Sequence, residues 1–173
     1  MRGGADWTAW LQLELFELVH FLRPANEGPT YDPHVSGSVR IYLPKARKLK
    51  HLTVKLTGRQ EIGFPDGVRA YEATTILEKE LSLVPDDQDS LHLEKGEHTF
   101  AFTITVPSNT PSFERCQYGK VRHVLHAKAK GLSALGGDLV SAEKPIYLIC
   151  NVSPRSRYKT RLCGWSGWLT VAS

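Results

Sequence analysis

The chain has 173 residues, of which 41% are hydrophobic and 23% are charged. This composition is typical of a globular protein and excludes a disordered chain, and the length fits one domain that buries about 70% of the surface its unfolded chain exposes. The net charge is +4, from 22 basic and 18 acidic residues. Because no field of a single sign covers such a molecule, we expect no nucleic-acid partner.

An apolar stretch occupies residues 7–22 near the N-terminus. Asp6 precedes it, and Glu14 and Glu17 interrupt it, so we expect neither a signal peptide nor a membrane span. Within it, residues 10–22 fit alternating strand, but they also fit an amphipathic helix because leucines recur at helical spacing. We favour the strand. Because neither a signal peptide nor a membrane span is expected, we expect the protein to be cytosolic and to attach to membranes only peripherally.

Alternation of apolar and polar residues predicts most of the other strands. Phe100 and Phe102 fall two residues apart, which predicts two aromatic rings on one inner face. The stretch 121–130 alternates an apolar face with a basic outer face. The stretch 146–152 is apolar on both faces over part of its length, so we expect a central or covered strand. In chain order the expected strands are 35–43, 52–56, a less regular one at 76–83, 100–106, 121–130 and 146–152.

Proline, glycine and aspartate clusters separate these strands at short intervals. Many short strands with regular turns predict an all-β antiparallel sandwich with little or no helix. From Pro154 onward the chain becomes basic and strand alternation stops. We therefore expect one domain at residues 10–153 and a divergent basic segment, outside that domain, at 154–173.

The sequence offers little support for a catalytic site. No Gly-x-Ser-x-Gly elbow and no phosphate-binding loop followed by a helix is present. His123 and His126 are three residues apart in an expected strand, so they point to opposite faces and cannot share a metal ion. His92 and His98 flank a turn without a third ligand at a supporting offset. We expect no enzyme, no metal and no cofactor.

Basic side chains offer the clearest binding hypothesis. One group lies between two expected strands, and a second lies on or beside the strand at 121–130. Lysine and arginine bind phosphate oxygens through charge-assisted hydrogen bonds. The alternative is that these residues form a solvated surface that keeps the sheet soluble and discourages edge pairing. The first group comprises Lys45, Arg47, Lys48 and Lys50 beside His51, and the second Lys120, Arg122, Lys128 and Lys130.

Several of these motifs occur in an order that resembles the arrestin N-terminal domain. Residues 31–41 (Tyr-Asp-Pro-His-Val-Ser-Gly-Ser-Val-Arg-Ile) resemble the arrestin turn that leads into a Val-x-Gly-x-Val strand, with His34 where the family usually has Gly. Residues 93–102 resemble its Leu-x-x-Gly-x-His-x-Phe-x-Phe element. The resemblance covers residues 10–153 and is greatest to the alpha-arrestin branch, although His123 replaces a frequent Tyr. Its other parts are residues 49–58, the Pro-x-x-x-Pro-Ser-Phe turn in 106–113, and the strand 119–129.

The resemblance implies an immunoglobulin-like sandwich, the N-terminal lobe of an arrestin, that is a non-catalytic cytosolic adaptor. Such a domain binds membrane-protein cargo or its cytosolic tails in endocytosis and ubiquitin-linked trafficking, with recruitment to the plasma membrane or endosomes. Alpha-arrestins recruit a ubiquitin ligase through Pro-Pro-x-Tyr motifs, and no Pro-Pro pair occurs in this sequence. A ligase would thus act through regions absent from the sequence, and we expect an isolated or truncated N-terminal lobe.

The resemblance also adds Lys95, which lies beside a position where receptor arrestins carry a phosphate-sensing basic residue. The first strand lacks the paired lysines of those arrestins. An alternative function is a structural sandwich that self-associates or pairs with another chain through exposed strand edges. The candidate partner-binding residues are Lys45, Arg47, Lys48, Lys50, Lys95, Arg122 and Lys128.

Overall fold

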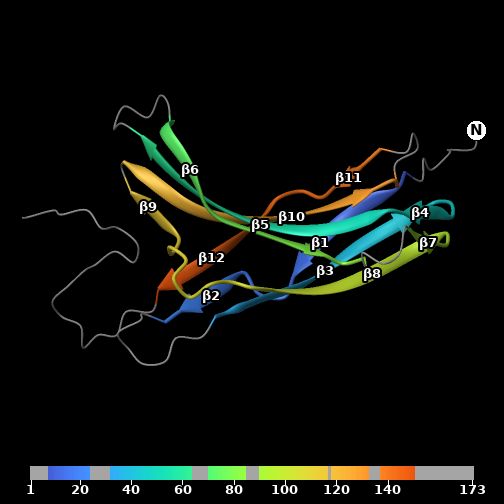
Figure 1. The fold of residues 1–173 in the computed structure, drawn as a ribbon, viewed down its shortest axis with the longest axis horizontal. Coiled ribbons are helices and arrows are strands. Elements are labelled where there is room, and N and C mark those ends of the chain that lie inside the picture. Colours follow the sequence, from blue (N-terminus) through green and yellow to red (C-terminus); the bar gives the residue numbers. More distant parts are fainter. Residues whose placement is uncertain are drawn as a thin grey trace, which may run out of the picture.

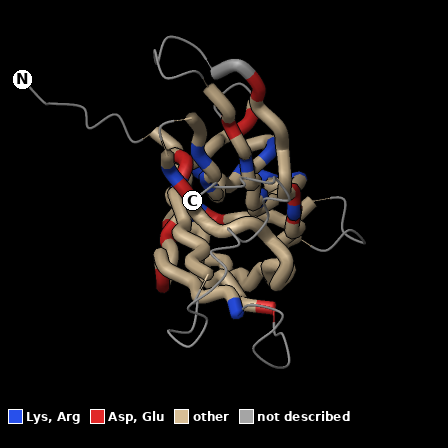
Figure 2. The backbone as a smooth tube through the Cα atoms, turned by 90° about the vertical axis from the view of Figure 1, so that its left-hand side faces the viewer, with Lys and Arg blue, Asp and Glu red and all other residues tan. Residues whose placement is uncertain are grey.

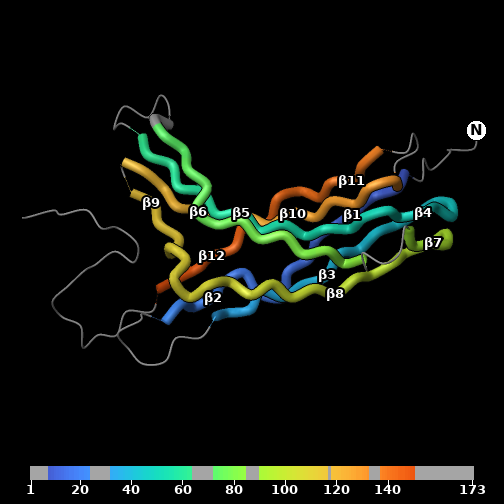
Figure 3. Tube along the Cα trace, in the orientation of Figure 1, coloured from blue at the N-terminus to red at the C-terminus, as the bar shows by residue number. Residues whose placement is uncertain are grey.

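The computed structural model describes residues 8–23, 32–63, 70–84, 90–116, 118–132 and 137–150, which form strands and connecting turns without a helix. Two curved layers lie face to face (Figures 1 and 3). All strand pairs are antiparallel except one. The expected all-β sandwich is therefore confirmed. Residues 151–173, including the basic segment 154–173, lie outside the described residues.

One layer is a three-stranded sheet in which the middle strand pairs with a partner on each side. Its alternating apolar residues point inward because successive side chains of a strand face opposite ways. Phe102 is buried and Phe100 packs against the same core, as the alternation predicts. In order across the sheet the strands are β1 (Trp10–Leu15), β3 (His34–Leu43) and β8 (Gly96–Thr105).

The other layer is a seven-stranded sheet built around β10 (Gly119–Lys130), which pairs with four other strands. The expected strand at 146–152 is seen here as β12, and its place between β2 and β10 confirms that it is central. The order across the sheet is β2 (Val19–Leu22), β12 (Lys144–Cys150), β10, β5 (His51–Gly63) and β6 (Ala70–Ser82), and the short strands β9 (Glu114–Cys116) and β11 (Leu139–Val140) also pair with β10.

A third, two-stranded sheet lies at one end of the sandwich (Figure 1). It pairs β4 (Arg47–Leu49) with β7 (Leu91–Leu93). Leu49 and Leu93 point into the core from these two strands. This two-stranded sheet thus closes the end of the sandwich, with Lys48 and His92 exposed to solvent.

The structure decides between strand and helix for residues 10–22. The segment forms β1 and β2, separated by Phe16–Leu18, so the amphipathic helix is wrong. β2 runs parallel to β12, with Val19 opposite Tyr147. The pairing of β2 with β12 thus brings together segments that lie near the two ends of the described residues.

Two core side chains, Phe102 and His123, each pack closely against a glycine of the neighbouring strand. A methyl group on Gly37, in β3, would meet the backbone carbonyl oxygen of Glu14 and lie 2.8 Å from the Phe102 ring. A methyl group on Gly58, in β5, would lie 2.8 Å from the ring of His123. His123 is 1% exposed, and neither ring nitrogen has a hydrogen-bond partner among the described residues. Burial lowers the pKa of His123 to about 4, because the charged imidazolium is disfavoured away from water.

Candidate functional site

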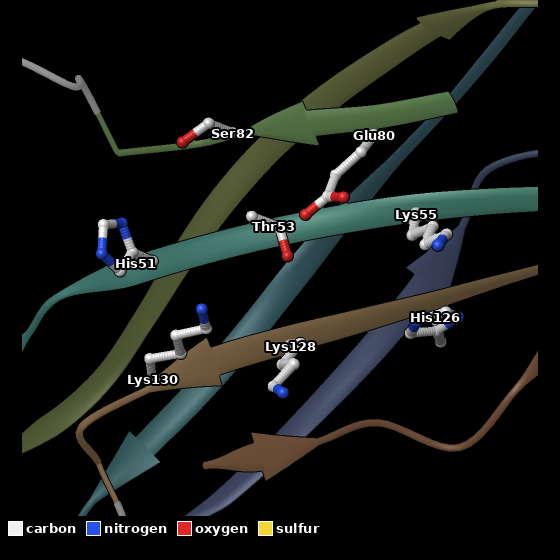
Figure 4. A pocket seen from close by; sticks show the side chains of 8 residues that line it. All are labelled: His51, Thr53, Lys55, Glu80, Ser82, His126, Lys128 and Lys130. Carbon is white, nitrogen blue, oxygen red and sulfur yellow. The ribbon is translucent and has the colours of Figure 1, made fainter. Parts of the chain in front are cut away.

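A shallow groove of about 460 Å³ lies on the solvent face of the seven-stranded sheet (Figure 4). β10, β5 and β6 each contribute alternate residues to it, since every second side chain of a strand shares a face. The register places these side chains in three rows across the strands: Lys130 beside His51; Lys128 beside Thr53, which neighbours Ser82; and His126 beside Lys55, which neighbours Glu80.

Two of the lysines in the groove are paired with carboxylates at its margin. Lys55 Nζ lies 2.8 Å from Glu78 Oε1, and Lys128 Nζ lies 2.8 Å from Asp138 Oδ2. The hydrogen bond to Glu78 raises the pKa of Lys55. Lys130 has no ion pair within the described ranges. The first row therefore carries the least compensated positive charge.

The predicted cationic loop lies at the end of the sandwich formed by β4 and β7 (Figure 1). Lys45, Lys48 and Lys50 are exposed there, while Arg47 is half-buried. Lys95 is exposed in the turn between β7 and β8, so the pairing of β4 with β7 brings it to the same end. We call Lys45, Lys48, Lys50 and Lys95 the basic end.

The basic end continues into the groove. The backbone N–H of Lys50 donates a hydrogen bond to the carbonyl oxygen of Lys130, at 3.1 Å. Two groups of basic residues that are far apart in the sequence thus meet, and Lys128 of the second group lies in the groove. Acidic segments are interspersed with the basic ones along the backbone (Figure 2), so the positive charge is local.

Arg122 is placed differently from the other candidates. Its Nη2 lies 2.8 Å from Glu61 Oε1, and Lys120 Nζ lies 2.9 Å from Glu61 Oε2. The Glu61 side chain is only 15% exposed, and the hydrogen bond from Lys120, with the charges of both cations, holds its pKa below the usual range. An anion at Arg122 would have to compete with this carboxylate, and Arg122 does not line the groove.

Sequence patterns did not identify the remaining residues of the groove as a set. Lys130 belonged to the second basic group, and His51 was noted beside the first. His126 was considered only as a metal ligand, and Thr53, Ser82 and Glu80 carried no signal of their own. The signal that could have found them is the pairing of β5 with β10, which extends over twelve residue pairs. Without that register, alternate residues of one strand cannot be matched to those of the next.

Histidines and acidic residues do not assemble a metal centre in the part of the chain that the structure describes. His123 lies in the core and His126 in the groove, which confirms that they point to opposite faces of β10. The rings of His92 and His98 both contact Glu94, through its carboxylate at 3.2 Å and its carbonyl oxygen at 2.8 Å respectively. Helices able to cross a membrane do not occur among the described residues.

Comparison with protein families agrees with this architecture. Residues 26–134 match the family described as "Arrestin (or S-antigen), N-terminal domain", which is more than half of the chain. The match includes β3 to β10, and hence the basic end and the three strands of the groove. No curated protein matches the chain at a significant level.

Proposed function

Because the chain belongs to the arrestin family through its N-terminal domain, we propose that it is a non-catalytic adaptor that binds the cytosolic tails of membrane-protein cargo. Membership of the family supports an adaptor role in general. Endocytosis and ubiquitin-linked trafficking are the processes in which the alpha-arrestin resemblance would place it, in the cytoplasm and at the plasma membrane or endosomes.

The continuity of the basic end with the groove is the observation that supports this proposal best. Exposed lysines in and beside β4 and in the turn before β8 lie at one end of the sandwich, where the backbone of Lys50 is bonded to Lys130 at the end of β10. Acidic or phosphorylated tails carry oxygens that accept charge-assisted hydrogen bonds from such side chains. A surface of this kind binds a charged segment without a deep cavity.

Charge reversal at the basic end is expected to weaken tail binding. Changing Lys45, Lys48 and Lys50 to glutamate removes three exposed cations and should lower affinity by between about threefold and about a hundredfold, since an exposed ion pair contributes roughly 0.2–1 kcal/mol. Affinity is measured by fluorescence anisotropy with phosphorylated and unphosphorylated tails of transporters at low salt. The half-buried Arg47 is left intact to preserve folding.

A matched control is Lys79→Glu, which changes an exposed lysine of β6 whose position faces away from the groove. This variant should bind like the unaltered chain. Unchanged affinity of the triple variant at low salt would dismiss the basic end, and absence of binding to any tail would overturn the adaptor function.

A second candidate function is self-association through β2, an edge strand of the seven-stranded sheet. β2 contains no Lys, Arg, Asp or Glu, and Phe21 is 55% exposed. The other edge strand, β6, carries four charged residues. Natural sheet edges are usually protected by charge, so an uncharged apolar edge favours pairing with another chain.

If β2 mediates self-association, Phe21→Lys should convert a dimer to a monomer, because a lysine places charge at the pairing edge. Sedimentation over a range of protein concentrations measures this. Val140→Lys alters an apolar residue of β11 that is similarly exposed, and it should leave the dimer intact. A monomer at every concentration in the unaltered chain would eliminate this second function.

A further inference from the structure

We propose that the groove on β10, β5 and β6 binds an extended peptide that carries acidic side chains on alternate residues. The peptide would lie along β10 with two acidic side chains over the first and second rows. This inference rests on the adaptor function proposed above and specifies which feature of a tail the groove recognises. It concerns the outer face of the sheet, whose cations are arranged by strand register.

The spacing of the cations supports an extended ligand. Lys130, Lys128 and His126 occupy successive positions on the same face of β10. Side chains on one face of a strand are about 6.6–6.8 Å apart along the chain. An extended peptide has the same period, so acidic residues at i and i+2 would face Lys130 and Lys128 together. Adjacent acidic residues would point in opposite directions, and only one of them would reach the groove.

The second row shows that a carboxylate can occupy this face. Asp138 places Oδ2 2.8 Å from Lys128 Nζ, and its side chain is 36% exposed. A ligand carboxylate could approach Lys128 in the same manner, sharing the ammonium with Asp138 or replacing it. Lysine has three donor hydrogens, which allows one ammonium to bind two carboxylates.

The first row offers stronger attraction to an anion. Lys130 is exposed and has no ion pair within the described part of the chain, and His51 lies opposite it in the register. The imidazole of His51 has a ring N–H to donate. An acidic side chain over this row would therefore meet a lysine and a second donor.

The third row sets the direction of the peptide. Lys55 is already paired with Glu78, and the charge of Glu80 also acts on Lys55. An acidic side chain over His126 would lie near these two carboxylates and be repelled. The preferred ligand thus has acidic residues over the first two rows and a neutral residue over the third, which distinguishes one direction along β10 from the other.

Hydroxyl groups in the second row refine this preference. Ser82 Oγ donates its hydrogen bond to the carbonyl oxygen of Val84, at 2.8 Å. The oxygen of Ser82 can then only accept a hydrogen bond, so it suits an N–H group of the ligand. Thr53, between Ser82 and Lys128, can donate to a ligand oxygen.

The test compares labelled peptides of equal composition and charge by fluorescence anisotropy at low salt. One peptide carries two glutamates separated by one residue, and the other carries them side by side. The alternating peptide should bind about threefold more tightly, because both carboxylates reach lysines. Equal affinity of the two peptides would overturn the proposed register.

Substitutions then locate the site on the full chain. Lys130→Glu should weaken the alternating peptide about tenfold, and the milder Lys130→Gln about threefold, while Lys79→Glu should have no effect. Glu80→Gln should strengthen binding of a peptide with a third alternate glutamate, whereas Glu72→Gln, on the same strand outside the groove, should not. Thermal unfolding of each variant verifies that it is folded. If binding is lost only in variants that fail to fold, the assignment of the peptide site to the groove is refuted.

The outcomes separate this inference from the adaptor function. If tails bind and respond to the basic end but not to Lys130 or Glu80, the groove is not the site and the adaptor function stands. If the alternating peptide binds and responds to Lys130 but no tail does, the groove stands and the adaptor function fails. If Lys130→Glu abolishes binding only to phosphatidylserine vesicles, the ligand is a membrane and the peptide is excluded.

Discussion

Gly37→Ala is expected to lower the free energy of unfolding by about 3 kcal/mol or more, or to prevent folding. Gly37 lies in the middle strand of the three-stranded sheet, opposite Leu15 on one side and Phe102 on the other. The added methyl group would collide with the backbone carbonyl oxygen of Glu14 and would lie 2.8 Å from the Phe102 ring. Because Glu14 is held in the strand pairing, neither neighbour can move away without disrupting the sheet.

Urea unfolding followed by circular dichroism measures the effect, with Ser36→Ala as the matched control. Ser36 is the preceding residue of β3, and its Oγ lies 3.0 Å from Thr103 Oγ1 at the surface. Loss of that hydrogen bond should lower stability by roughly 1 kcal/mol or less. A Gly37→Ala variant as stable as Ser36→Ala would show that β1, β3 and β8 are less closely packed at Gly37 than the structure indicates.

His123 is expected to make the protein less stable as the pH falls from about 6.5 to about 4. Burial lowers the pKa of the folded-state imidazole to about 4, whereas an unfolded histidine has a pKa near 6.5. Above pH 6.5 both states hold a neutral ring. Below it the unfolded chain binds a proton that the folded chain does not, so stability is lost progressively, by about 3 kcal/mol at pH 4.

Urea unfolding at several pH values checks this expectation with His123→Leu, which removes the titrating ring and two nitrogens that have no partner among the described residues. The variant should have a smaller loss of stability between pH 6.5 and pH 4. Carboxylates such as Glu61, whose pKa is lowered, still lose stabilisation in acid, so some slope remains. His126→Gln should keep the full pH dependence, and an equal slope in His123→Leu would contradict the role of His123.

The alternation of apolar and polar residues predicted strands best where one face of the strand is buried along its length and the other face contacts solvent. β10 is the clearest example, because its inner residues are buried and its outer residues contact solvent along the whole strand. β6 was harder to recognise because its pairing with β5 shifts between Gly58 and Arg59, which leaves Ile76 without a direct partner and interrupts the period. β4 and β9 are three residues long and too short to show a period.

The basic residues of the candidate site could be predicted one by one, but their assembly could not. Basic residue types identified Lys128 and the lysines of the basic end. The sequence could not indicate that Arg122 is paired with Glu61, because these residues meet only through the register of β5 and β10. The same register sets Lys130 beside His51, so the groove depends on long-range pairing that no local pattern encodes.

The parallel pair of β2 and β12 has a consequence for synthesis on the ribosome. β2 pairs only with β12 in the described part of the chain, so Val19 cannot pair until Tyr147 has been synthesised. Ribosomes add about 5–20 residues per second, so roughly 130 intervening residues delay the pairing by about 6–25 s. During that time the apolar β2 has no sheet to join. The last folding step is therefore expected to follow the completion of β12, and the nascent chain to need protection from aggregation until then.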